Sequence, residues 1–216
     1  VYRPSTGAWL ILTSTSAFTA SVSHTWGAPG DLPLNGDYDG DGLWDPAVYR
    51  PSTGQWLVLA SSSGHIAQTS RTWGASGDVP IPGDFDADGR DEIASIVSFS
   101  GIRVQDPESG DLLWEYSPGS VGVLAAADFD DEPGSELLYA ETYWSTIHVL
   151  DGATETELET IESPEDYVSK IVVGDTDADG VLNLLWSTGI YSANSEHLYL
   201  ARSDPGQIEA HTEDWS

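Results

Sequence analysis

The sequence contains no cysteine and no methionine, and its only lysine is Lys170. Without cysteine the chain has no disulfide scaffold, no Cys-ligated zinc or iron–sulfur site and no thiol nucleophile. It also lacks an apolar run close to the roughly 18 residues that a membrane span needs. Seven Lys+Arg stand against 36 Asp+Glu, and the net charge of −29 repels phosphate backbones and anionic lipids. We therefore expect no nucleic-acid partner and no insertion into a membrane.

Recognisable catalytic motifs are also missing. No G-x-S-x-G sequence provides a nucleophile elbow, and the five histidines are scattered without H-x-x-x-H spacing. We expect each histidine to be a surface or sheet-edge residue rather than a ligand. A carboxylate pair for glycoside hydrolysis stays open because acidic residues are so abundant. The prediction is a protein that is not an enzyme.

A repeat organises the chain. The segment 1–12 returns almost unchanged as 48–59, an offset of 47 residues, and the same offset carries Trp26-Gly27 onto Trp73-Gly74. In the second half the repeated segments are less similar in sequence, but an acidic cluster recurs at nearly the same interval. The clusters begin at Asp37, Asp84, Asp128 and Asp175, in steps of 47, 44 and 47 residues.

Between the clusters the sequence predicts β-hairpins closed by Pro/Gly turns and rich in Val, Ile, Trp, Tyr and Thr. The paired segments are 47–50 with 56–60, 102–105 with 112–116, 146–150 with 156–161, and 184–188 with 197–201. No 11-residue window shows an apolar stripe at helical spacing. We therefore predict an all-β chain.

Units of 44 to 47 residues with about four short strands each favour a β-propeller of about four to five four-stranded blades. A β-sandwich is the alternative fold, although sandwich strands need not recur at a constant period. We expect one propeller region over 1–216, which is part of a larger propeller or is completed by neighbouring copies in an assembly. The expected blades are 1–27 (partial), 28–74, 75–118, 119–166 and 167–216.

The four acidic clusters align without gaps as nine-residue loops with oxygen side chains at positions 1, 3, 5 and 9. Alternate carboxylates in a tight loop can converge on one hard cation, and Ca²⁺ accepts six to eight oxygen ligands. Position 6 is glycine in three loops, as expected where the chain turns with positive φ. The candidate ligands are Asp37, Asp39, Asp41, Asp45, Asp84, Asp86, Asp88, Glu92, Asp128, Asp130, Glu132, Glu136, Asp175, Asp177, Asp179 and Asn183.

An EF-hand begins with the same letters but needs a bidentate Glu at position 12 and two flanking helices. Position 12 is Val48, Ser95, Tyr139 and Trp186, and all four lie in predicted strands. The loops therefore connect strands. The remaining alternative is that they are merely solvated acidic turns.

The D-x-D-x-D-G-x-x-[DEN] loops, and the Trp-Gly…Gly-Asp-x-Pro…Gly-Asp run before the first two, resemble the FG-GAP/VCBS repeat family, which is related to the propeller of integrin α-chains. The resemblance implies that each loop braces its blade with Ca²⁺, about four ions in all, through the sixteen residues above. Two departures stand out: Pro133 replaces the position-6 glycine in the third loop, and Asn183 supplies a neutral oxygen in the fourth.

The aromatic residues divide into two groups. Trp9, Trp56, Trp26 and Trp73 recur at repeat positions, so we expect them to pack inside the blades. Trp44 and Trp144 break the repeat and are candidates for ligand recognition.

These observations predict a secreted or cell-surface, calcium-stabilised propeller that acts as a non-catalytic adhesion or recognition module for a protein or a glycan. Two alternatives remain. One is an accessory or catalytic propeller of a polysaccharide lyase or hydrolase, and the other is a structural repeat subunit of a surface assembly or filament.

Overall fold

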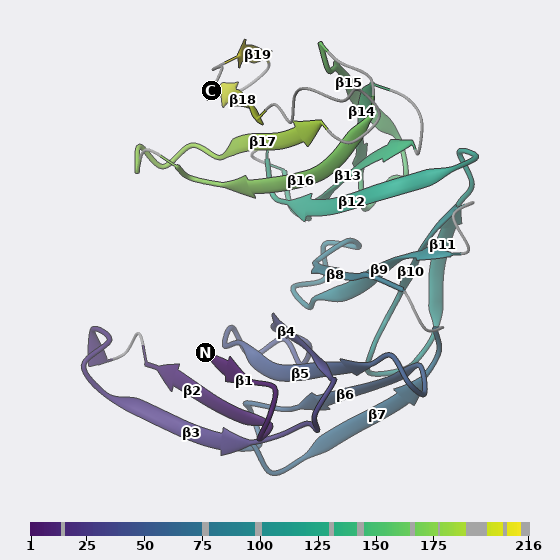
Figure 1. Ribbon diagram of the computed structural model, residues 1–216. Helices are drawn as coiled ribbons and strands as arrows, with labels where there is room; N and C mark the ends of the chain where they lie inside the picture. Colours follow the sequence, from purple (N-terminus) through teal and green to yellow (C-terminus); the bar gives the residue numbers. More distant parts are fainter. Residues whose placement is uncertain are drawn as a thin grey trace.

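The computed structural model (Figure 1) describes residues 1–13, 16–74, 78–97, 101–129, 132–141, 145–164, 167–176, 178–188, 198–204 and 207–212. Within these residues the chain forms five antiparallel β-sheets and no α-helix, which confirms the all-β prediction. It contains no helix long and apolar enough to cross a membrane in the part described.

Each sheet is a meander in which consecutive strands pair. The first sheet has three strands, β1 (Tyr2–Arg3), β2 (Ala8–Leu12) and β3 (Ser21–Thr25). The second has β4 (Leu32–Gly36), β5 (Asp45–Arg50), β6 (Gln55–Leu59) and β7 (Gln68–Thr72). The third has β8 (Pro80–Gly83), β9 (Glu92–Val97), β10 (Gly101–Gln105) and β11 (Leu112–Tyr116). The fourth has β12 (Val121–Ala127), β13 (Glu136–Glu141), β14 (Thr146–Asp151) and β15 (Glu157–Glu162). The fifth has β16 (Val168–Gly174), β17 (Asn183–Thr188), β18 (Leu198–Asp204) and β19 (Gln207–Thr212).

The four predicted hairpins are confirmed. Strand β5 pairs with β6, β10 with β11, β14 with β15 and β17 with β18, each in antiparallel register. Their ends differ from the predicted ones by only a few residues. Val, Ile and aromatic residues at alternating positions, closed by Pro/Gly turns, explain why these segments were recognisable.

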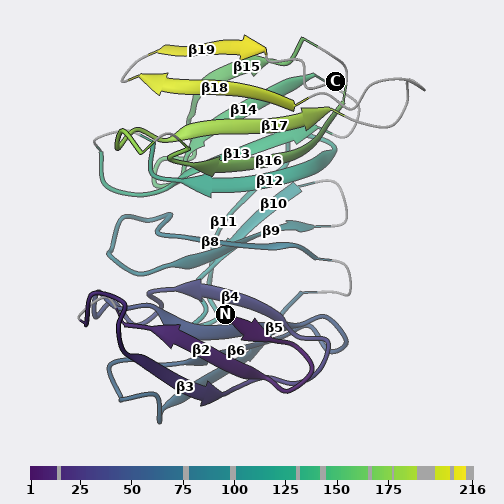
Figure 2. The same cartoon turned by 60° about the vertical axis from the view of Figure 1, so that its left-hand side comes forward.

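The five sheets follow one another in chain order along an arc, as Figures 1 and 2 show. The first strand of each four-stranded sheet lies on the inside, so that β4 contacts β8, β8 contacts β12, and β12 contacts β16. Neighbouring blades thus face each other as in a propeller, and the sandwich alternative is wrong. The acidic loops all join a first strand to a second strand, which places them on one side of the arc of blades.

The core lies between neighbouring sheets. One cluster joins Tyr49 and Trp56 of the second sheet to Ile93 of the third. Another joins Ile102 of the third sheet to Leu137 of the fourth. A third cluster joins the fourth and fifth sheets. Burying a large apolar side chain contributes roughly 1.5–3 kcal/mol, so the sheets are held mainly by these contacts.

The Pro-Ser-Thr-Gly and Trp-Gly motifs recur because the backbones of their glycines lie close together. The turn glycines Gly7 and Gly54 both have a φ of +65°, and a Cβ on Gly7 would lie 2.6 Å from the carbonyl oxygen of Gly27. Trp9 Nε1 donates to the carbonyl of Trp26 (3.1 Å), as Trp56 Nε1 does to the carbonyl of Trp73 (2.8 Å). These contacts fix the outer strand of each of the two blades. Trp9 and Trp56 are buried, which confirms their predicted packing role.

Candidate metal sites

Loop one, residues 37–45, joins β4 to β5 and wraps around its first residue. The carboxylate of Asp37 accepts the backbone N–H groups of Gly40 (2.8 Å), Asp41 (3.1 Å) and Gly42 (2.7 Å). Gly42 has a φ of +82°, the left-handed conformation that lets the chain double back here. The backbone therefore turns the carboxylates at positions 1, 3 and 5 toward one another.

Three carboxylates meet in loop one. Asp37, Asp39 and Asp41 each offer an oxygen, and these oxygens lie within 4.8 Å of one another. The Oδ2 atom of Asp39 accepts from Ser62 Oγ (2.7 Å), and the Oδ1 atom of Asp41 accepts from Ser61 Oγ (2.9 Å). The other oxygen of Asp39, Oδ1, is buried and has no hydrogen-bond partner. A buried carboxylate oxygen without a donor is costly, and a bound cation would satisfy it.

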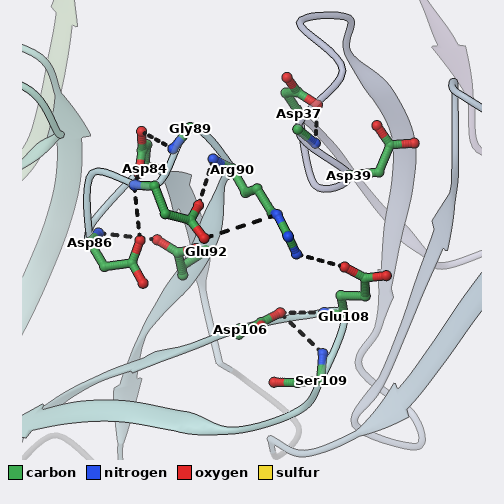
Figure 3. A network of polar contacts seen from close by, with 12 residues as sticks. Asp37, Asp39, Asp84, Asp86, Gly89, Arg90, Glu92, Asp106, Glu108 and Ser109 are labelled. Atoms are coloured by element: carbon green, nitrogen blue, oxygen red, sulfur yellow. Dashed lines mark hydrogen bonds and ion pairs between the residues drawn. The ribbon is translucent and has the colours of Figure 1, made fainter.

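Loop two, residues 84–92, repeats this arrangement between β8 and β9 (Figure 3). The carboxylate of Asp84 accepts from the N–H groups of Asp88 (3.1 Å) and Gly89 (3.0 Å). Here the oxygens that lie within 4.8 Å of one another belong to Asp84, Asp86 and Glu92. Both groups of three carboxylates use positions 1 and 3. The third carboxylate comes from position 9 in loop two and from position 5 in loop one.

The electrostatics of loop two are unfavourable without a cation. Burial, opposed by the hydrogen bond from Phe85 N–H and assisted by the neighbouring carboxylates of Asp86 and Asp84, raises the pKa of Glu92 to about 8. Burial, followed by the charge of Asp88, raises the pKa of Asp86 as well. Carboxylates with raised pKa values lack compensating positive charge, which a metal ion would supply.

Position 9 has the same structural role in all four loops. Its side-chain oxygen accepts the backbone N–H of the residue at position 2: Asp45 from Tyr38 (2.9 Å), Glu92 from Phe85 (2.8 Å), Glu136 from Phe129 (2.6 Å) and Asn183 from Thr176 (2.8 Å). All four side chains are buried. Because only an acceptor is required, Asn183 closes the fourth loop as well as a carboxylate closes the others.

Asp45 differs from Glu92 in how its oxygens are used. Its Oδ2 accepts from Tyr38 and Asp39, and its Oδ1 accepts from the N–H of Ser61 (2.6 Å). Burial raises its pKa. The structure therefore shows Asp45 holding loop one against the β6–β7 turn, outside the group of three.

The third and fourth loops are described only in part, because Asp130 and Asp177 lie outside the described residues. In loop four Asp175 accepts from Asp179 (3.3 Å) and Gly180 (3.0 Å), as its equivalents do in loops one and two. In loop three the positive φ moves one residue on from Pro133, to Gly134 with +120°. Asp128, Glu132, Glu136, Asp175, Asp179 and Asn183 form no group of three in the described part of the chain.

The structure reveals contacts that sequence reasoning missed. Ser61 and Ser62 reach loop one from the β6–β7 turn, and no sequence pattern connects these serines to the acidic loop. His24 and His65, which we expected to be surface or sheet-edge residues, stack across neighbouring blades with ring centroids 4.2 Å apart. Trp44, at position 8 of loop one, is 70% exposed, whereas Trp144 lies outside the described residues.

The donor set fits a hard cation. Every side-chain ligand candidate in loops one and two is an oxygen, and neither nitrogen nor sulfur enters either group. Oxygen-only sites suit Ca²⁺ or Mg²⁺ and not zinc or copper, and an irregular loop with several carboxylates suits the larger ion, whose coordination geometry is less strict.

No family model matches the chain, and no curated protein matches it. Among solved structures it is similar to BBS1N, in a complex with ARL6DN, with 17% identity, a TM-score of 0.58, and 85% of this chain and 56% of that chain covered. It is also similar to Sqt1 of Saccharomyces cerevisiae, with 14% identity, a TM-score of 0.50, and 87% and 50% covered. A structure of RRP9 WD40 repeats matches with 16% identity, a TM-score of 0.44, and 81% and 58% covered. The chain spans about half the length of these structures. At such identities the likeness shows the fold alone, and that fold is a β-propeller.

Proposed function

We propose that the chain is a calcium-stabilised β-propeller of the FG-GAP/VCBS kind that acts as a non-catalytic recognition module. The observation that carries the proposal is the group of Asp37, Asp39 and Asp41, with the buried Oδ1 of Asp39 lacking any donor. Loop two repeats the group with Asp84, Asp86 and Glu92.

Charge supports calcium as the structural ion. Loop one holds four aspartates in nine residues and no Lys or Arg. Two unit charges about 4 Å apart repel by about 1–4 kcal/mol over the range from water to a protein surface. A divalent ion at the centre of such a loop turns this repulsion into attraction. When bound, Ca²⁺ would be held by the carboxylates of loops one and two. It would supply the positive charge that loop one lacks and that Arg90 alone supplies in loop two.

The proposed kind of site favours an extracellular location. Exposed loops that bind Ca²⁺ at about 10⁻⁴–10⁻³ M are empty at cytosolic calcium levels and filled outside the cell. We therefore propose that the protein works outside the cell, secreted or at the cell surface.

For recognition we propose a protein or glycan partner on the side of the arc that carries the loops. There Leu43 and Trp44, 55% and 70% exposed, stand at the rim of loop one. An exposed indole beside a fixed acidic loop offers both apolar contact and oriented polar groups. No described constellation of residues favours the enzymatic alternative over recognition.

The proposal is tested by thermal unfolding of the whole chain in excess EDTA, in 1 mM Mg²⁺ and in 1 mM Ca²⁺. At a Kd of about 0.1 mM, each filled site adds roughly 1.4 kcal/mol of stability. We expect Ca²⁺ to raise the melting temperature and Mg²⁺ to have little effect. An unchanged melting temperature in Ca²⁺ would show that the loops are not structural calcium sites.

A second experiment addresses the partner. Glycan arrays and protein pull-downs, run with and without Ca²⁺, should show binding that depends on calcium and weakens in Trp44→Ala. The control is Trp114→Phe, since Trp114 of β11 is buried in an apolar cluster and position 114 stays aromatic as Phe. Binding that is indifferent to Trp44 would place the recognition surface elsewhere.

A further inference from the structure

Loops one and two are joined directly through Asp91. This residue, at position 8 of loop two, donates its N–H to the carbonyl oxygen of Asp37 (2.8 Å). In return, the N–H of Asp37 donates to Oδ2 of Asp91 (2.6 Å). Asp37 is the first candidate ligand of loop one, and Asp91 directly precedes Glu92, a candidate ligand of loop two. Two hydrogen bonds thus connect the backbones that carry the two ligand sets.

The surroundings of Asp91 are shaped for this contact. A Cβ on Gly36, the last residue of β4, would lie 2.6 Å from Asp91 Oδ2, so only glycine leaves room for the carboxylate. Asp91 is half-buried, and burial raises its pKa, with the nearby carboxylates of Asp84 and Asp37 adding to the shift. A carboxylate kept in such a place has a positional role, because its burial is otherwise unfavourable.

Part of the contact recurs one blade further on. Ser135, at position 8 of loop three, donates its N–H to the carbonyl oxygen of Asp84 (2.7 Å). The backbone half of the connection is therefore a feature of the repeat. The side-chain hydrogen bond, in which Oδ2 of Asp91 at position 8 of loop two accepts the N–H of Asp37 at position 1 of loop one, is not shown for Ser135.

Because of these two hydrogen bonds, ordering one loop also orders part of the other, so the entropy lost on ordering is not incurred separately by each loop. An ion in loop two holds the segment from Asp84 to Glu92, and with it both bonding groups of Asp91. These groups then hold the backbone of Asp37 in the conformation in which its carboxylate faces Asp39. A second ion meets a loop that is already ordered, which is the condition for positive cooperativity.

We propose that Asp91 is a positioning residue that couples cation binding in loop two to cation binding in loop one. The inference rests on the proposed calcium function and adds a pathway between two of its sites. Asp91 is not a ligand of either ion; it acts through Asp37.

The test is a Ca²⁺ titration of the whole ¹⁵N-labelled chain by NMR. Gly42 and Gly89 each donate to the first aspartate of their own loop, so their amide signals report the two loops separately. Asp86→Asn disables loop two, and we expect it to weaken Ca²⁺ binding at Gly42 about fivefold, the lower end of typical coupling between sites. The matched control Asp179→Asn, in loop four, should leave the affinity at Gly42 unchanged.

Variants of Asp91 separate the hydrogen bond from the charge. In an Asp91→Ala background the effect of Asp86→Asn on Gly42 should fall well below fivefold, because the side-chain bond to Asp37 N–H is gone and only the backbone bond from Asp91 N–H remains. Asp91→Asn keeps an acceptor for the N–H of Asp37 and should keep the fivefold effect. If Asp91→Asn behaves like Asp91→Ala, charge and not the hydrogen bond couples the loops, and the proposal is wrong.

The outcomes distinguish a failure of the coupling between loops from a failure of calcium binding itself. If neither Gly42 nor Gly89 responds to millimolar Ca²⁺, the calcium function itself fails. If both respond but Asp86→Asn leaves the affinity at Gly42 unchanged in the otherwise native chain, the loops bind independently and only the coupling is refuted. This comparison needs no Asp91 variant, so it stands even where Asp91→Ala does not fold.

Discussion

Backbone conformation at single residues decides whether the acidic loops can form. Gly42, Gly89 and Gly180, all at position 6, have φ values of +82°, +89° and +88°. At position 4 the same region is occupied by Gly40 in loop one but by Ala87 and Ala178 in loops two and four, each with a φ of +61°. Alanine in this region costs about 1–2 kcal/mol, so two loops hold strained residues in place.

Gly42→Ala isolates this cost. A Cβ at Gly42 meets no atom within 4 Å, so the penalty is conformational, and we expect a loss of about 1–2 kcal/mol in the free energy of unfolding. Gly174→Ala is the matched control, since its Cβ also meets nothing within 4 Å and its φ is not positive. Denaturant unfolding of both variants measures the difference. Equal stabilities would show that the loop relaxes without strain.

The pKa of Glu92 predicts how the metal-free protein responds to pH. Its folded-state pKa of about 8 lies above the ordinary 4.5, so the folded state holds a proton that the unfolded state has lost. The resulting stability is complete below about pH 4.5 and is lost as pH rises through about 8. In EDTA we expect a lower melting temperature at pH 8.5 than at pH 6, and a smaller difference in Glu92→Gln. A melting temperature that rises over this interval would contradict the assignment.

At the scale of elements, the sequence predicted more of the strands than of the loop interiors. Hairpins were evident because alternating Val, Ile and Trp with Pro/Gly turns act locally. The positions of carboxylates along each loop were evident too. Which oxygens turn inward was not, because backbone N–H groups compete for the same oxygens. In loop one Asp45 bonds to Ser61, 16 residues away, and no local pattern encodes that contact.

Asp39→Asn tests the loop as a binding element. Asp39 supplies the oxygen that has no donor, and an amide at this place weakens the attraction for a divalent ion. We expect calorimetry to show one Ca²⁺ fewer per chain. Asp111→Asn, an exposed change in the turn between β10 and β11, should leave the number of ions unchanged. A stoichiometry that is unaffected by Asp39→Asn would remove loop one from the sites.

At the scale of the whole molecule, stability depends on contacts between blades. The repeat predicts that such contacts exist but not which residues make them. The constant period indicated that units pack against one another. The pairs that meet across blades have no shared signal in the sequence: His24, for example, lies in β3, whereas its partner His65 lies in the β6–β7 turn. The first strands β4, β8, β12 and β16 lie innermost, and the acidic loops follow directly from them. Loop geometry and blade packing are thus parts of one arrangement.

Phe85→Ala probes that connection. Phe85, at position 2 of loop two, is fully buried, and Cβ atoms on Gly83 and Gly152 would both lie 3.0 Å from its ring, so it fills the space between the third and fourth sheets. Removing a buried Phe ring costs about 3–5 kcal/mol, which we expect in guanidinium unfolding at saturating Ca²⁺. The control Phe18→Ala removes the same ring from a side chain that is 63% exposed, and its effect should stay within about 0.5 kcal/mol. Because Phe85 N–H also bonds to Glu92, the variant should weaken the Ca²⁺ response of the Gly89 amide as well. Loss of stability with an unaltered response at Gly89 would show that blade packing and the loop-two site are independent.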